Sequence, residues 1–265
     1  MAEVYGSILK VPLPTDTRVH YQSTNGYIVG RSGAILIDPA ADTPALDQAC
    51  EKQTIELLVL THTHSDHIGA VGTYVDRYDP LVIAHENYTA LFEKRTGIAA
   101  DQTMGDGDTI IAGDGTEMSV VSTPGHAVDH VAFAVESDLI SGDLVFESGS
   151  VYVGGDGGNM RAYLESLELI TISGYDRLFP GHGPVITNPT STIERLLEHR
   201  LAREKTILTA IREGARTPEE VVAAVYDRDL SGIRDLAVKT TIAHLEKLAD
   251  DGIIGWDGDR INYPL

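Results

Sequence analysis

The chain has a single cysteine and no long apolar run. Cys50 has no second cysteine with which to form an internal disulfide, and its amphipathic surroundings favour a half-buried helical thiol over a nucleophile. No stretch reaches about 18 consecutive apolar residues, so we expect no membrane span and no membrane partner. The first residues lack the apolar core of a secretory signal. These features predict a cytoplasmic protein.

Lysine is scarce in an acidic chain. Only 6 of the 20 basic residues are lysine, and the formal net charge is −20. This composition resembles the acidic, lysine-poor surfaces of halophilic proteins; an ordinary acidic enzyme is the alternative. Strong negative charge disfavours nucleic-acid partners, but the Debye length falls to about 3 Å in molar salt and this objection weakens. Charge alone therefore leaves single-stranded RNA open as a substrate.

The distribution of apolar residues predicts strands interspersed with helices. With 265 residues, 42% of them hydrophobic, the chain can bury one full-sized core and a small second one. The periodicity by itself indicates only a mixed α/β protein. Strands are expected at 5–10, 17–22, 27–30, 34–39, 57–60, 81–84, 117–123, 131–136, 138–143 and 177–180, and helices at 43–53, 68–77, 86–94 and from 158 onward.

The segment LLVLTHTHSDHIG, residues 57–69, combines a strand with metal-type ligands. The apolar run ends at Leu60 and is followed by three histidines and an aspartate within six residues, namely His62, His64, Asp66 and His67. An ordinary loop with a helix cap near Ser65 is the alternative. Neutral imidazoles together with a carboxylate are the ligands expected of catalytic zinc, so we interpret the block as a metal motif.

Three further candidate ligands occur in similar local settings. His126 lies in STPGHAVDH, Asp143 in LISGD and His182 in LFPGHGPVI. Each follows an apolar run and stands beside a glycine, which leaves the backbone room to approach a metal.

The HxHxDH block, with these three ligands in this order, resembles the metal motifs of the metallo-β-lactamase fold hydrolases. GGDGGNMRAYLESLE, LFPGHGPVI and EHRLAREKTIL further resemble the β-lactamase-like protein 2 subgroup. This resemblance implies an α/β fold, an αββα sandwich over residues 1–189, followed by a small winged-helix-like α+β domain over 190–265.

The resemblance also implies a dinuclear zinc site. It places His62, His64 and His126 on one ion and Asp66, His67 and His182 on the other, with Asp143 between them. Asp66 and Asp143 are then the catalytic carboxylates, and a hydroxide held between two Zn²⁺ is the nucleophile. Manganese and iron are alternatives, because imidazole and carboxylate suit several metals.

Three other residues are weaker candidates. His130 resembles a recurring polar position with a catalytic or ligand-orienting role; a satisfied structural histidine is the alternative. Asp38 is expected to hold the motif loop. His199, in EHRLARE, faces either the cleft or the seam between domains.

The last 76 residues predict a three-helix module with a hairpin. Helices are expected at 191–213, after a Thr217–Pro218 cap, and at 234–249, and Asp257–Gly258 indicates a hairpin. Residues 190–265 hold 11 Lys/Arg against 14 Asp/Glu, or −3, and 1–189 hold 9 against 26, or −17. Because no basic helix is present, duplex DNA is not expected, and a lid or channel wall is favoured.

Three functions remain in competition. The first is cleavage of single-stranded RNA phosphodiesters, as described for members of the subgroup. The second is hydrolysis of small esters or thioesters, of the hydroxyacyl-thiol or polyketide thioesterase type. The third is a non-catalytic binding module, which the complete ligand set argues against. The sequence contains no signal for an oligomeric state.

Overall fold

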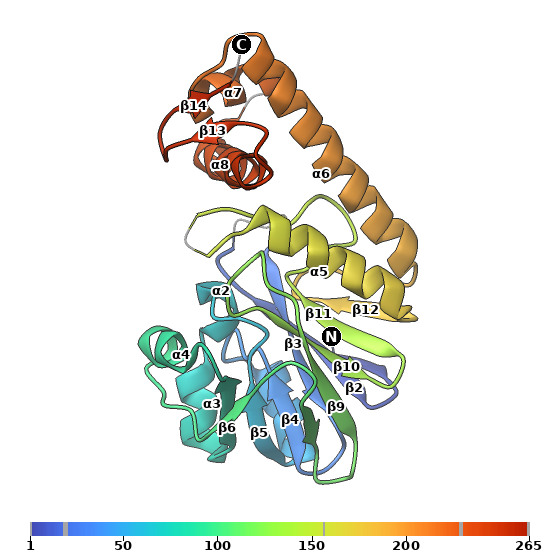
Figure 1. The fold of residues 1–265 in the computed structure, drawn as a ribbon. Helices are drawn as coiled ribbons and strands as arrows, with labels where there is room; N and C mark the ends of the chain where they lie inside the picture. The colour runs from blue at the N-terminus through green and yellow to red at the C-terminus, as the bar shows by residue number, and fades with distance from the viewer. Residues whose placement is uncertain (1, 18–20, 156, 228–229, 264–265) are drawn as a thin grey trace. The chain divides into compact units, whose positions relative to one another are not determined.

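The structure is a computed structural model that describes residues 2–17, 21–155, 157–227 and 230–263 (Figure 1). It divides into two compact units. The first comprises Met1–Thr123, Asp129–Gly149 and Gly174–Pro189, and the second comprises Pro124–Val128, Ser150–Ser173 and Thr190–Leu265. The sequence did not indicate the two earlier segments of the second unit. The independence of 190–265 as a domain stays a prediction.

The first unit contains a mixed sheet of seven strands, which lie in sequence order. The first four strands pair antiparallel, and the last four pair parallel. The strands are β1 (Glu3–Tyr5), β2 (Ile8–Pro14), β3 (Ser23–Val29), β4 (Ala34–Ile37), β5 (Ile55–Val59), β6 (Leu81–His85) and β7 (Gln102–Met104).

A second sheet of five strands has the order β12-β11-β10-β9-β8. Its strands pair antiparallel except β11 and β12, which are parallel. The strands are β8 (Thr109–Ile111), β9 (Glu117–Ser122), β10 (Val131–Val135), β11 (Asp138–Gly142) and β12 (Arg177–Pro180).

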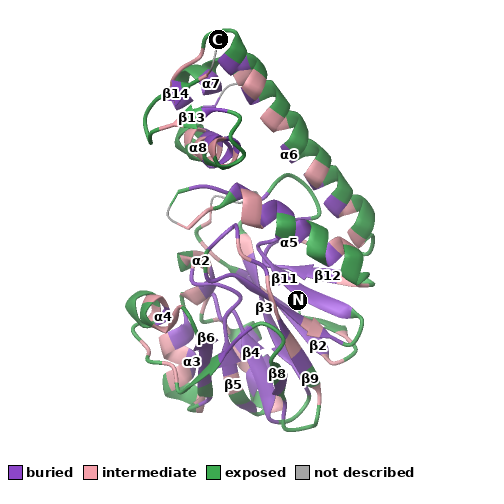
Figure 2. Ribbon diagram, in the orientation of Figure 1, coloured by how far each residue is buried: buried purple, intermediate pink, exposed green. Residues whose placement is uncertain are grey.

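The two sheets face each other across a shared apolar core. Alternation along β4 sends Ile35 and Ile37 into this core, where they join Val120 and Phe133 from the second sheet, and turns Leu36 to the opposite face. Figure 2 shows the strands of both sheets largely in the colour of buried residues. The predicted α/β architecture with two facing sheets is confirmed.

Helices cover the outer face of the seven-stranded sheet. Leu46 and Cys50 of α1 (Pro44–Gln53), Tyr74 of α3 (Val71–Tyr78) and Phe92 of α4 (Thr89–Thr96) bury their side chains there. The side chain of Thr43 caps α1 by accepting from the Leu46 N–H at 3.2 Å. Cys50 is fully buried, and burial raises the pKa of its thiol to about 12, which argues against a nucleophile.

The structure corrects three predicted elements. The strand expected at 5–10 is interrupted after Tyr5, because Gly6 takes a left-handed turn conformation between β1 and β2. No strand occupies 21–22, and residues 18–20 of that expected strand lie outside the described residues. The helix expected at 68–77 is two helices, α2 (Ser65–Ile68) and α3. The helical hydrogen bonding stops between them, because the N–H of Ala70 donates to the Pro39 carbonyl instead of to a carbonyl of α2.

The second unit is mainly helical. The C-terminal helices and the hairpin enclose a core of Ile207, Val221, Leu245, Leu248 and Ile261. Thr217 caps its helix as expected, accepting from the Glu220 N–H. A winged-helix relationship stays a prediction. The elements are α5 (Met160–Ser173), α6 (Pro189–Arg212), α7 (Pro218–Val225), α8 (Arg234–Asp250), β13 (Gly255–Trp256) and β14 (Ile261–Asn262). Among the described residues, no helix is long and apolar enough to cross a membrane.

Candidate metal centre

The metal motif of the sequence follows the buried strand β5. This strand lies between β4 and β6 and runs parallel to both. Its carboxyl end therefore opens at the sheet edge where α/β proteins bind ligands. His62 and His64 lie in the loop after β5, and Asp66 and His67 lie in the short helix α2.

The second sheet contributes two further candidate ligands from its parallel pair. Asp143 directly follows β11, and His182 comes two residues after β12. The Gly181 N–H donates to the Gly142 carbonyl at 2.8 Å, which holds the two strand ends together. The Asn25 N–H of β3 donates to the Gly181 carbonyl at 2.7 Å, so the two sheets meet at this edge. We call the edge formed by the ends of β5, β11 and β12 the rim.

Four predicted ligands converge at this rim. Nε2 of His67 lies 3.4 Å from Oδ1 of Asp143, and Nε2 of His182 lies 3.4 Å from the other oxygen of that carboxylate. His182 Nε2 is also 3.6 Å from Oδ2 of Asp66. Within the first unit, two groups of described residues have ligand atoms within 4.8 Å of one another and could hold a metal: Asp66, His67 and His182, and His62, His67 and Asp143.

Hydrogen bonds at Nδ1 fix the ring orientation of two predicted histidine ligands, His182 and His126. Nδ1 of His182 lies 2.7 Å from the Ser23 carbonyl oxygen, and Nδ1 of His126 lies 2.7 Å from the Tyr152 carbonyl oxygen. A carbonyl only accepts, so each Nδ1 carries the proton and each Nε2 keeps its lone pair for a cation. Nε2 of His67 and of His182 are both buried without a hydrogen-bond partner among the described residues. The donor set therefore fits a divalent metal.

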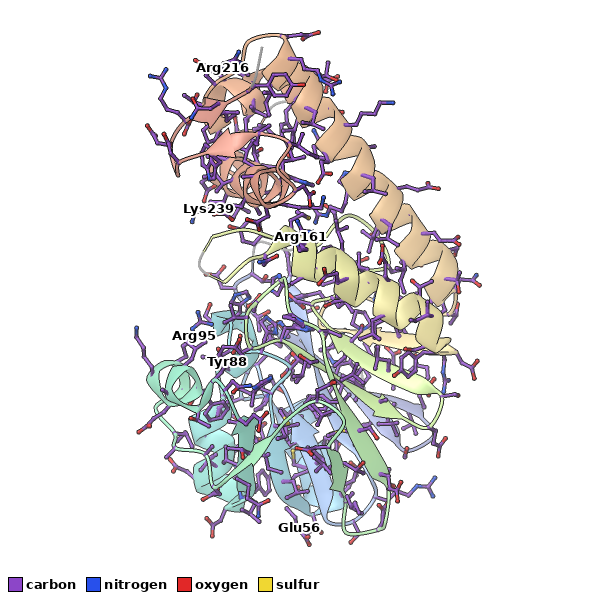
Figure 3. The ribbon with its side chains drawn as sticks, in the orientation of Figure 1. Glu56, Tyr88, Arg95, Arg161, Arg216 and Lys239 are labelled. Carbon is purple, nitrogen blue, oxygen red and sulfur yellow. The ribbon has the colours of Figure 1, made fainter. Side chains whose placement is uncertain are left out.

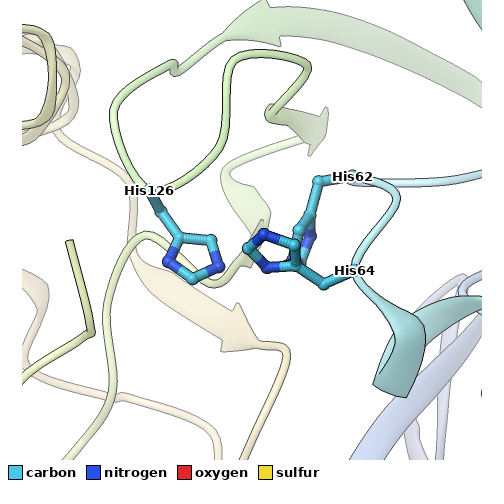
Figure 4. A group of neighbouring side chains, drawn as sticks. All are labelled: His62, His64 and His126. Atoms are coloured by element: carbon cyan, nitrogen blue, oxygen red, sulfur yellow. The ribbon is translucent and has the colours of Figure 1, made fainter. Parts of the chain in front are cut away.

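His62 and His64 present facing ring nitrogens. Nε2 of His62 is 3.0 Å from Nδ1 of His64, and the rings meet edge to face with centroids 4.6 Å apart. Figure 4 shows these two side chains with His126. His126 comes from a five-residue segment, 124–128, that belongs to the second unit and connects β9 to β10.

The charges at the rim perturb each other strongly. Burial by itself lowers the pKa of His67, but the carboxylates of Asp143 and Asp38 outweigh it and hold this pKa well above its usual value. Burial and Asp143 oppose each other in the same way at His182, whose pKa is raised. Burial opposes ionisation of Asp143, yet the two imidazoles hold its pKa well below the normal range. Without a metal the site thus retains protons that a cation would displace.

His130 occupies a structural place beside the candidate ligands. Its Nε2 accepts from the Asp143 N–H at 3.0 Å, so its Nδ1 carries the proton and donates to Thr123 Oγ1 at 2.8 Å. The ring is buried and both nitrogens are engaged. Engagement of both nitrogens is what the alternative of a satisfied structural histidine expects, and a catalytic or ligand-orienting role of His130 stays a prediction.

Asp38 holds the motif loop as expected. Its Oδ1 accepts from the Thr61 N–H at 2.8 Å, and its Oδ2 accepts from Thr61 Oγ1 at 2.6 Å. Asp38 is fully buried and has a φ of 49°, a conformation that aspartate tolerates better than most residues. His199 lies exposed on α6, and its functional role stays a prediction.

Sequence reasoning missed two residues that shape the site, Asp129 and Thr63. Asp129 is buried and accepts from Thr63, which stands between His62 and His64. The aspartate in HAVDH was a visible signal, but nothing in the sequence pointed to Thr63 as its partner. Gly181 has Asp143 Oδ1 and His67 Cε1 where a Cβ would stand.

The family follows from the comparison with known proteins. The model of the family described as "Metallo-beta-lactamase superfamily" matches residues 20–182, more than half of the chain. The chain belongs to the metallo-beta-lactamase superfamily. It is therefore a member of a hydrolase superfamily whose proteins bind divalent metals.

Relatives match over most of the chain. A "Beta-lactamase-like protein 2 homolog" of Drosophila melanogaster is 32% identical and covers 93% of this chain and 89% of its own. An "Atrochrysone carboxyl ACP thioesterase" of Aspergillus novofumigatus is 31% identical and covers 89% and 76%. A solved metallo-beta-lactamase family protein of Thermus thermophilus has a TM-score of 0.75 at 22% identity and covers 98% and 99%. At 22% identity, the similarity to the Thermus thermophilus structure is evidence for the fold alone.

Proposed function

We propose that the protein is a dinuclear zinc hydrolase of acyl thioesters or related esters. The observation that carries the metal part is the pair of buried Nε2 atoms on His67 and His182, which face opposite oxygens of Asp143 while their Nδ1 atoms are held by oxygens. Buried imidazoles in this arrangement are costly unless a cation satisfies them.

The seven proposed ligands divide between two ions. His62, His64 and His126 hold one ion, and Asp66, His67 and His182 hold the other, with Asp143 shared between them. The Asp66, His67 and His182 grouping supports the second set directly. The facing nitrogens of His62 and His64 and the Nδ1 contact of His126 support the first. Manganese or iron would suit the same donors.

Bound zinc would polarise the carbonyl oxygen under attack and lower the pKa of a bound water to about 7. The protein's own residues keep the ligands in place for this chemistry. Asp38 orients His67, and Nε2 of His130 accepts a hydrogen bond from the backbone N–H of Asp143. The side chains of both are buried, so the ligand geometry is set before a substrate arrives.

The substrate assignment draws on the relatives and on charge. A relative that is 31% identical carries the name of an acyl carrier protein thioesterase. The net charge of −20 disfavours a polyanionic substrate at ordinary ionic strength. Single-stranded RNA remains the competing prediction, because high salt would screen that repulsion.

A parallel assay distinguishes these substrates. The zinc-loaded protein and its Asp143→Ala variant would be incubated with butyryl-N-acetylcysteamine and with a single-stranded RNA oligomer, at low and at molar potassium chloride. Thioester turnover that the variant loses is the expected result. RNA cleavage without thioester turnover would replace the proposed substrate by a phosphodiester. Absence of both activities in a protein that holds its metals would favour a binding module.

A further inference from the structure

A small pocket that is open to solvent lies beside His62. Its lining includes His62, Thr63 and Asp129, together with Tyr88 and Phe92. The pocket therefore joins a proposed metal ligand to the start of α4. This surface therefore adjoins one proposed ligand of the metal site.

Arg95 lies on the same side of α4 as the two aromatic residues. Tyr88 immediately precedes the helix, and the three positions are spaced i, i+4 and i+7, which places them along one face. Figure 3 labels Tyr88 and Arg95. Arg95 is exposed, in contrast to the buried Phe92, so its guanidinium stands at the solvent side of this face.

The guanidinium is tethered to the loop that carries the proposed ligands. Nη1 of Arg95 donates to Thr63 Oγ1 at 3.0 Å and to the Thr63 carbonyl at 3.4 Å. Thr63 is fixed in turn, because its hydroxyl and its N–H both donate to Oδ2 of the buried Asp129, at 2.5 and 3.1 Å. Arg95 is thus held beside the residue that separates His62 from His64.

Arg95 keeps its positive charge uncompensated. Lys10, Arg77 and Arg177 of the same unit each form an ion pair, but no carboxylate of the described residues lies within ion-pair distance of Arg95. The Nη2 and Nε groups have no partner among the described residues and remain available for an oxyanion.

We propose that Arg95 is a specificity-determining residue that binds a carboxylate or phosphate group of the substrate. The inference rests on the proposed function, because it assigns one more feature of the substrate that is hydrolysed at the rim. A planar guanidinium held by Thr63 can offer two parallel N–H donors to a planar oxyanion. The anion belongs either to the acyl part or to the thiol part of the substrate.

Two variants that each remove one positive charge from α4, assayed on anionic and neutral thioesters, test the proposal. Arg95→Met would be compared with Lys94→Met, which removes the same charge from the neighbouring exposed position of α4. Glutaryl-N-acetylcysteamine places a carboxylate on the acyl part, butyryl-coenzyme A places phosphates on the thiol part, and butyryl-N-acetylcysteamine carries neither. We expect KM for one anionic substrate to rise about tenfold or more in Arg95→Met alone, with kcat and zinc content unchanged.

Calorimetric titration of zinc-loaded protein with glutarate and with coenzyme A gives a readout that needs no turnover. Anion binding that Arg95→Met weakens and Lys94→Met retains would support the inference even if no thioester is hydrolysed, a result that would remove only the proposed function. Equal KM and equal binding in the two variants would overturn the inference and leave the hydrolase assignment standing. If Arg95→Met lost zinc and lost activity on the neutral substrate as much as on the anionic ones, the inference would also be overturned. Arg95 would then serve to hold Thr63 in place.

Discussion

Nδ1 of His67 lies 2.8 Å from Oδ2 of Asp38, and both side chains are completely buried. The same carboxylate holds the backbone and hydroxyl of Thr61. Asp38 therefore connects the end of β4 to the first residue of the motif loop and to one proposed ligand within it. A single side chain thus orients the imidazole and fixes the loop from which the neighbouring histidines project.

Replacement of Asp38 by asparagine tests this connection. The amide retains one oxygen for the Thr61 N–H and tolerates the positive φ, but it cannot supply the negative charge beside His67. We expect zinc affinity to fall about 10- to 100-fold, the range seen when the outer partner of a metal-bound histidine is lost. Competition with a chromogenic chelator measures the affinity, and Asp47→Asn on α1 serves as a control. An unchanged affinity would separate Asp38 from the metal centre.

Asp143→Ala removes the carboxylate that faces both His67 and His182. We expect most of the hydrolytic activity and one metal equivalent to be lost, because this carboxylate is the proposed shared ligand. Metal analysis after gel filtration gives the stoichiometry independently of any substrate. Retention of both equivalents would refute the shared role, whereas a protein that unfolds would be recognised by circular dichroism.

The raised pKa of His67 predicts how metal stabilisation varies with pH. A histidine whose folded pKa is raised stabilises the metal-free protein below its unfolded value of 6.5, and this contribution is lost as pH rises through the folded pKa. A metal removes the need for that proton. The melting temperature of zinc-loaded protein should therefore exceed that of chelator-treated protein by an increasing margin as pH rises above 6.5. Distant histidines contribute equally to both forms, and a margin that shrinks with pH would contradict the prediction.

Local patterns in the sequence predicted most strands and the ligand block, because alternation and clustering are visible within a few residues. Asp66 and His67 needed only their own segment to be recognised, whereas His182 needed the family resemblance to be connected with them. The break between α2 and α3 was missed because it depends on a hydrogen bond from Ala70 to Pro39, thirty-one positions earlier. The Asp129–Thr63 contact was missed for the same reason, since pairs of distant polar side chains leave no periodic signal.

Gly181→Ala tests how closely the rim is packed. A Cβ at this position would lie 2.8 Å from Cε1 of His67 and would overlap Oδ1 of Asp143, so both side chains would have to move. We expect a loss of zinc affinity together with a stability cost of about 1–3 kcal/mol, the usual range for an overpacked site. Gly72→Ala in α3 is the matched control, because nothing lies within 4 Å of its Cβ position. Chelator competition and thermal unfolding measure the two effects, and a Gly181→Ala protein that binds zinc as tightly as Gly72→Ala would show that His67 and Asp143 are not held in contact at a metal centre.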